Sequence, residues 1–77
     1  MDVPKLIKMA NEIGGFFAAE PERPVALEGV AGHIARFWDP RMRRELVAPL
    51  DAGQAEALSP LVLEALNAHR KRIAPAT

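Results

Sequence analysis

The division of this chain into helices is decided by seven residues near its middle, Phe37-Trp38-Asp39-Pro40-Arg41-Met42-Arg43. Asp39 can accept a hydrogen bond from the free backbone N–H groups at the start of a helix. Pro40 suits the first helical position, because its missing N–H is no loss there. One helix is therefore predicted to end at Phe37 or Trp38, and another to begin at Asp39-Pro40.

Upstream of this joint the sequence predicts two helices separated by the breaker Glu20-Pro21-Glu22-Arg23-Pro24. The first is expected from Pro4 to about Ala19 and the second from about Pro24. The inward face of the first is predicted from helical spacing to hold Leu6, Ala10, Ile13 and Phe17, widened by Met9 and Phe16. The second is predicted to turn Leu27, Val30, Ile34 and Phe37 inward.

Two pairs of glycines lie inside these predicted helices. Gly14-Gly15 weakens helix propensity and could permit a bend or a close backbone contact. Gly29 and Gly32 share the side of their helix that faces away from the apolar stripe, where they bring no burial. We interpret them as places where another backbone approaches closely, and the alternative is a break or irregular turn in the helix.

Downstream, a third helix is expected with Met42 and Leu46 inward, and Pro49 is predicted to kink or end it. Gly53 is available for a left-handed cap. A fourth helix should begin at the N-cap Ser59 and end before Pro75. Its apolar stripe is predicted to consist of Val62, Leu66, His69 and Ile73.

These patterns predict an all-α protein, a small bundle of about four short helices, with residues 1–74 forming a single domain and 75–77 a disordered tail. A chain of 77 residues buries only about 60% of the surface that its unfolded form exposes. The sequence contains no Cys and two isolated His residues, so neither a disulfide nor a structural zinc site is expected to strengthen the fold. A partner chain is the remaining common source of stability for a domain this small.

Charge and hydropathy narrow the function classes. Ten basic residues balance ten acidic ones, so total charge does not favour nucleic acid or anionic lipid as a partner. The beginning of the sequence lacks the pattern of a secretory signal, and no apolar segment approaches the roughly 20 residues that cross a bilayer. We therefore expect a cytoplasmic protein that binds neither membrane nor nucleic acid.

The sequence offers little for catalysis. It has one Ser and one Thr and lacks Cys and Tyr, and Ser59 is better explained as a helix cap. His33 and His69 have no metal-ligand spacing, and the glycines form no phosphate-binding motif. We expect no catalytic, cofactor-binding or metal-binding residue in this chain.

Binding is the function that the helix joint favours, because aromatic and Arg side chains are frequent in interaction hot spots. Two alternatives stay open: a nucleic-acid-binding regulator that uses the Arg36–Arg44 basic patch, and a solvated helix face with surface ion pairs. A homodimer of the isolated chain is also possible. The predicted partner-binding residues are Gly29, Gly32, Arg36, Phe37, Trp38, Asp39, Pro40, Arg41, Met42, Arg43 and Arg44.

The run Phe37–Arg43, read with residues 6–13, Phe16-Phe17, residues 29–34 and Ser59-Pro60-Leu61-Val62, resembles the delta subunit of NAD-dependent, molybdenum-containing formate dehydrogenase. The resemblance covers nearly the whole chain. It implies an accessory subunit without redox groups that supports assembly or stability of the catalytic alpha subunit. Molybdopterin, iron–sulfur clusters and FMN are then expected in the alpha, beta and gamma subunits, and the alpha subunit is the expected contact.

Overall fold

Five helices follow one another along the chain in the computed structural model, which describes residues 2–75. They are α1 (Val3–Phe17), α2 (Arg23–Phe37), α3 (Pro40–Asp51), α4 (Pro60–Ala68) and α5 (Arg70–Ile73). Four of them span nine residues or more, and α5 is a single short turn of four. The predicted all-α class is confirmed. Of the expected tail 75–77, residues 76 and 77 lie outside the described residues.

Local capping explains where three of the helices begin. The carboxylate of Asp39 accepts a hydrogen bond from the Met42 backbone N–H at 3.0 Å, and the Ser59 hydroxyl accepts one from the Val62 N–H at 3.5 Å. Asp2 caps α1 in the same way. A proline in the first turn follows each cap, where its missing N–H costs nothing. The predicted caps at Asp39 and Ser59 are confirmed.

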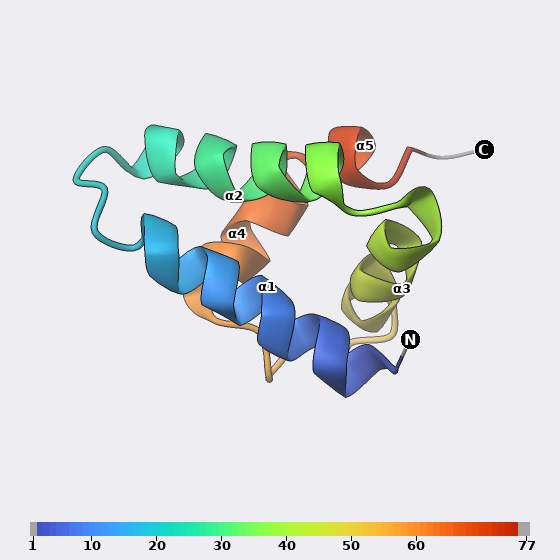
Figure 1. Cartoon of the computed structure of the whole chain (residues 1–77). Coiled ribbons are helices and arrows are strands. Elements are labelled where there is room, and N and C mark those ends of the chain that lie inside the picture. The colour runs from blue at the N-terminus through green and yellow to red at the C-terminus, as the bar shows by residue number, and fades with distance from the viewer. Residues whose placement is uncertain (1, 76–77) are drawn as a thin grey trace.

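Figure 1 shows α1 crossing in front of α4, with α2 along one side and α3 at the far end. Helix α2 packs against α1, α4 and α5, and α1 also contacts α3 and α4. The interior is filled from all five helices. The largest fully buried side chains are Leu6, Val30, Ile34, Leu46, Val62, Leu66 and Ile73.

The dimensions of the chain match those expected of a folded single chain of this size. The radius of gyration is 11.2 Å, against about 11.5 Å for a folded domain of this length. The accessible surface is 4777 Å², against about 4,600 Å² for a folded monomer of this mass. The chain therefore has the compactness of a folded monomer.

Helix α3 continues through Pro49 and ends two residues later, at Asp51. Its end is a Schellman motif, in which the Gln54 N–H donates to the Pro49 carbonyl at 2.7 Å and the Gly53 N–H to the Leu50 carbonyl at 3.2 Å. Gly53 has a φ of +70°, which a glycine adopts without steric cost. Gly53 is thus the left-handed cap, as predicted, and the turn it closes ends the helix instead of Pro49.

The predicted single helix from Ser59 to Pro75 is wrong, because it breaks at His69. His69 has φ −117° and ψ 29°, outside the helical region, and separates α4 from α5. The break lets α5 pack against α2 and α3. Arg70 reaches Asp51 of α3 at 2.6 Å and Arg72 reaches Glu28 of α2 at 2.6 Å. These exposed pairs contribute little, so the burial of Ile73 in the core is the larger reason that the continuous helical pattern is overridden.

Gly14 lies where α1 crosses α4. It is buried, and a Cβ atom at this position would lie 2.6 Å from Cγ2 of Val62. A side chain larger than hydrogen would therefore keep the two helices apart. The close contact expected from the Gly14-Gly15 pair is confirmed at Gly14, whereas nothing lies within 4 Å of a Cβ at Gly15.

Asn11 ties the segment between α3 and α4 to the first helix. Its side-chain amide donates to the Ala57 carbonyl at 2.9 Å, and its carbonyl oxygen accepts from the Ser59 N–H at 2.9 Å. The two bonds fix the loop just before the Ser59 cap. This gives α4 a defined starting position against α1.

Candidate partner-binding surface

The structure splits the aromatic pair at the helix joint. Trp38 is 6% exposed and belongs to the core, whereas Phe37 is 73% exposed. The backbone leaves the helix at Trp38, with φ −93° and ψ 136°, and this turn carries the indole inward while Phe37 stays on the outer side of α2. The prediction that Phe37 lies on the inward stripe is therefore wrong. Met42 is half-buried against the core, and Asp39 and Pro40 are exposed.

The four arginines near the joint lie in different surroundings. Arg41 is 80% exposed and pairs with Glu45 at 3.4 Å, an interaction worth little at a surface. Arg43 is half-buried, and its Nη1 donates to the Arg72 carbonyl at 3.4 Å. Arg44 and Arg36 are both exposed. Arg44 borders a hollow beside α5, and Arg36 borders one that runs along α2 from Val25 to Phe37.

Gly29 and Gly32 are approached by side chains of this same chain. A Cβ at Gly29 would lie 2.5 Å from the Phe17 ring, so that ring rests directly on the helix backbone. A Cβ at Gly32 would lie 3.0 Å from a Glu28 carboxylate oxygen and 3.2 Å from an Arg72 guanidinium nitrogen. Helix α2 is continuous through both glycines, so the alternative of a break there is wrong. Their role in binding a partner stays a prediction.

Glu28 and Arg72 form the ion pair that covers Gly32. Nη1 of Arg72 donates to both carboxylate oxygens of Glu28, at 2.7 and 2.6 Å. This hydrogen bonding, more than the charge of Arg72, holds the pKa of the Glu28 carboxyl below its usual value. In the same way, the hydrogen bond to Asp51 raises the pKa of Arg70. Both pairs anchor α5 to the bundle.

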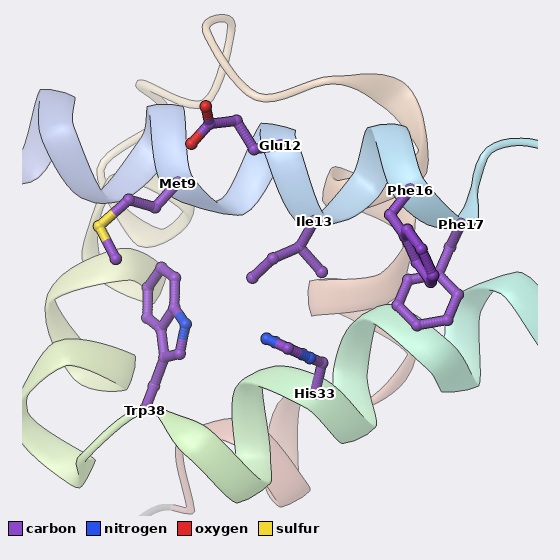
Figure 2. A pocket seen from close by; sticks show the side chains of 7 residues that line it. All are labelled: Met9, Glu12, Ile13, Phe16, Phe17, His33 and Trp38. Atoms are coloured by element: carbon purple, nitrogen blue, oxygen red, sulfur yellow. The ribbon is translucent and has the colours of Figure 1, made fainter.

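An open apolar groove of about 600 Å³ lies between α1 and α2. In Figure 2, Met9 and Trp38 point toward each other at one end of it, and Ile13 and His33 point into it from opposite helices. Phe16 and Phe17 close the other end, and Glu12 points away from α2 on the outer side of α1. The residues that line it are Met9, Glu12, Ile13, Phe16, Phe17, His33 and Trp38.

Two aromatic rings stand out from the protein beside this groove. Phe16 is 79% exposed, so its prediction as part of the inward stripe is wrong, and its ring meets that of Phe17 edge-on at 5.0 Å. Phe37 is tilted against the His33 ring at 4.9 Å. Large exposed apolar groups that lie close together mark interaction surfaces. We call the groove and the rings of Phe16 and Phe37 the aromatic groove.

Only part of the aromatic groove is predicted from the sequence. Sequence reasoning selected Phe37 and Trp38 but assigned Met9, Ile13 and Phe16 to the core. Their spacing carried a signal, because Met9, Ile13 and Phe16 follow one another at i, i+4 and i+7 beside the stripe that Leu6 and Ala10 begin. The apolar face of this helix is therefore wider than the stripe that a surface helix needs to pack on the core, and part of it can stay exposed.

The described residues hold no group suited to bind a metal. Among residues 2–75, no three His, Cys, Asp or Glu side chains gather closely enough to do so. The single Ser of the chain, Ser59, uses its hydroxyl as the cap of α4. Among the same residues, no helix has the length and apolar character needed to cross a membrane.

Fold and surface together define a class: a small all-α domain whose main surface feature is an exposed aromatic groove. Comparison with known families gives the particular member of that class. The family model described as NADH-dependent formate dehydrogenase delta subunit FdsD matches residues 5–66, and the chain belongs to this family. Neither a curated protein nor a solved structure matches it. The resemblance seen in the sequence is thereby confirmed.

Proposed function

We propose that this chain is a non-catalytic accessory subunit of a cytoplasmic formate dehydrogenase and supports assembly or stability of the catalytic alpha subunit. In this proposal the chain binds no cofactor, and molybdopterin, iron–sulfur clusters and FMN are held by the alpha, beta and gamma subunits. Its contribution is a binding surface.

The observation that carries the proposal is the family match over residues 5–66, which spans most of the chain. The chemistry of the sequence agrees with it. Iron–sulfur clusters are bound mainly through Cys thiolates, and the chain has no Cys. The hydroxyl of its one Ser is engaged in capping α4, which is a structural role and not that of an activated nucleophile.

Docking is proposed through the outward part of the helix joint. Phe37 supplies an exposed ring, and Arg36 and Arg41 add exposed guanidinium groups beside it. Trp38 contributes from within the core by holding the joint in place. Substitution of Trp38 would therefore test folding, and Phe37 is the better probe of docking.

Deletion of this subunit's gene tests the function directly. We expect less alpha subunit in the assembled complex, with its transcript level unchanged, and recovery when the wild-type chain is supplied from a plasmid. Activity per assembled complex should be unchanged if the chain is only accessory. Normal amounts of assembled, stable complex in the deletion strain would contradict the proposal.

Co-purification addresses membership in the complex separately. The untagged chain should elute with the alpha subunit when another subunit of the complex carries the affinity tag. A control with the tag on an unrelated protein excludes carry-over. A chain that never accompanies the complex, under conditions that keep the other subunits together, would refute its role as a subunit.

A further inference from the structure

We propose that the aromatic groove receives an amphipathic α-helix of the catalytic alpha subunit, with its apolar face on Ile13 and Phe16 and its acidic side toward α2. This inference rests on the proposed function, because it names how that subunit would be held. It goes beyond the helix joint predicted from the sequence, since most of the residues that line the groove belong to α1.

The apolar character of the site is the first reason. Phe16 and Phe37 are exposed by 79% and 73%. Phe16 lines the groove, Phe37 lies against His33 at its edge, and the groove is lined mainly by apolar side chains. Val25 is the remaining large hydrophobic residue that is exposed among residues 2–75, and it borders the adjoining hollow with Phe37. Aromatic side chains are enriched at the centres of protein interfaces. The strongly exposed apolar surface is therefore concentrated on one side of the molecule.

The shape of the site favours a helix as its occupant. The α1 residues that line the groove run from Met9 to Phe17, which covers about 12 Å along the helix axis. An amphipathic helix of roughly two to three turns matches that length, and helix-in-groove recognition uses apolar anchors spaced three or four residues apart. Strand addition needs an unpaired sheet edge, which residues 2–75 do not provide because they contain no strand.

The charges beside the groove give the occupant an orientation. Glu12 lines the groove on the α1 side, and Arg36 lines the adjoining hollow, which shares Phe17 and His33 with the groove. Neither has an ion-pair partner within the described part of the chain. Complementary charges across an interface fix register and speed association. The occupant should therefore carry Asp or Glu on the flank facing Arg36 and Lys or Arg on the flank facing Glu12.

Direct binding of the purified chain to the purified alpha subunit tests this inference. Phe16→Ser and Phe37→Ser should each weaken the affinity at least about tenfold. Arg36→Glu should weaken it about threefold to tenfold at low salt, with a smaller effect at high salt because exposed charges are screened. Circular dichroism should show that each variant keeps its helical content.

Lys71→Glu is the matched control, because it reverses an exposed cation of α5 that borders a different hollow. We expect less than a twofold change in affinity. If Lys71→Glu weakens binding while Phe16→Ser and Phe37→Ser do not, the groove is not the docking site, although the proposed function stands. If the wild-type chain does not bind the alpha subunit or its complex, the proposed function fails as well.

Hydrogen exchange of the alpha subunit identifies the occupant. Binding of the wild-type chain should protect one helical segment with apolar residues at i, i+3 or i+4 and i+7 and with acidic residues on one flank. Protection of an extended or proline-rich segment would overturn the helical occupant. Sedimentation of the chain alone adds a further outcome: a dimer that Phe16→Ser converts to a monomer would show a second copy in the groove and overturn the inference.

Discussion

Replacing Gly14 by Ala should destabilise the protein relative to the same replacement at Gly15. The two glycines are neighbours in α1, so each substitution gains the same intrinsic helix propensity, about 1 kcal/mol. They differ in what the new methyl group meets. At Gly14 it would lie 2.6 Å from Cγ2 of Val62, whereas at Gly15 it meets nothing within 4 Å.

The size of the difference follows from how little the neighbour can move. Ordinary van der Waals contact begins near 3.4 Å, so the 2.6 Å separation is short by 3.4 − 2.6 = 0.8 Å. Val62 is fully buried and β-branched, which restricts its χ1 rotamers, so α1 and α4 must separate or the core must repack. Overpacking of this kind costs about 1–3 kcal/mol. Because the propensity gain cancels, this cost is the expected difference between the two variants.

Thermal unfolding followed by circular dichroism, supported by urea titration, measures that difference. For a domain of this length 1 kcal/mol corresponds to about 4–8 °C in Tm, so Gly14→Ala should melt roughly 5–20 °C below Gly15→Ala. Gly15→Ala itself should melt about 4–8 °C above the wild type. Equal stability of the two variants, or a more stable Gly14→Ala, would refute the close packing of α1 on α4.

Trp38→Ala should destabilise the domain by about 3–5 kcal/mol, because it empties a buried aromatic site, and urea unfolding followed by circular dichroism would show it; a loss below about 1 kcal/mol would contradict the burial of the ring. Asn11→Ala removes two hydrogen bonds to the loop before Ser59 and should lower the free energy of unfolding by about 1–2 kcal/mol. Limited proteolysis should cleave that loop faster than in the wild type, and an unchanged cleavage rate would contradict the role of Asn11. The hydrogen bonds from Arg72 lower the pKa of Glu28 in the folded protein, so this pair stabilises the fold above the usual pKa of about 4.5 and the contribution disappears as the pH falls through the lowered value. Glu28→Gln should therefore reduce Tm at neutral pH and make Tm fall less steeply as the pH is lowered. If Tm of the variant falls with pH as steeply as Tm of the wild type, the Glu28–Arg72 pair does not contribute to the acid dependence.

Helix starts and one helix end were predictable because the interactions that define them are local. An N-cap such as Asp39 or Ser59 bonds to a backbone N–H three residues away, and the Schellman turn at Gly53 closes within six residues. Such contacts can be recognised in a short window of sequence. The family could be recognised as well, because Phe37–Arg43 and its flanks form a pattern that extends over most of the chain.

The parts that sequence reasoning missed depend on where another helix lies. Phe16 has the same helical spacing as core residues, yet it is exposed. The stripe of Val62, Leu66, His69 and Ile73 keeps helical spacing, yet the helix breaks at His69 and Ile73 is buried in the core from a separate turn, α5. Periodicity shows which residues share a face but not which face a neighbour covers.

The sequence by itself determined an all-α chain, the places where three of its longer helices begin, the glycine that ends α3 and the formate dehydrogenase delta subunit family. Only the tertiary structure decided which ring at the helix joint is buried, which side of α1 stays open and where the last helix breaks. Caps and turns depend on contacts between neighbours in the chain, whereas burial depends on the packing of segments far apart in sequence. The aromatic groove belongs to the second kind, because its two walls, α1 and α2, come together only when the bundle has formed.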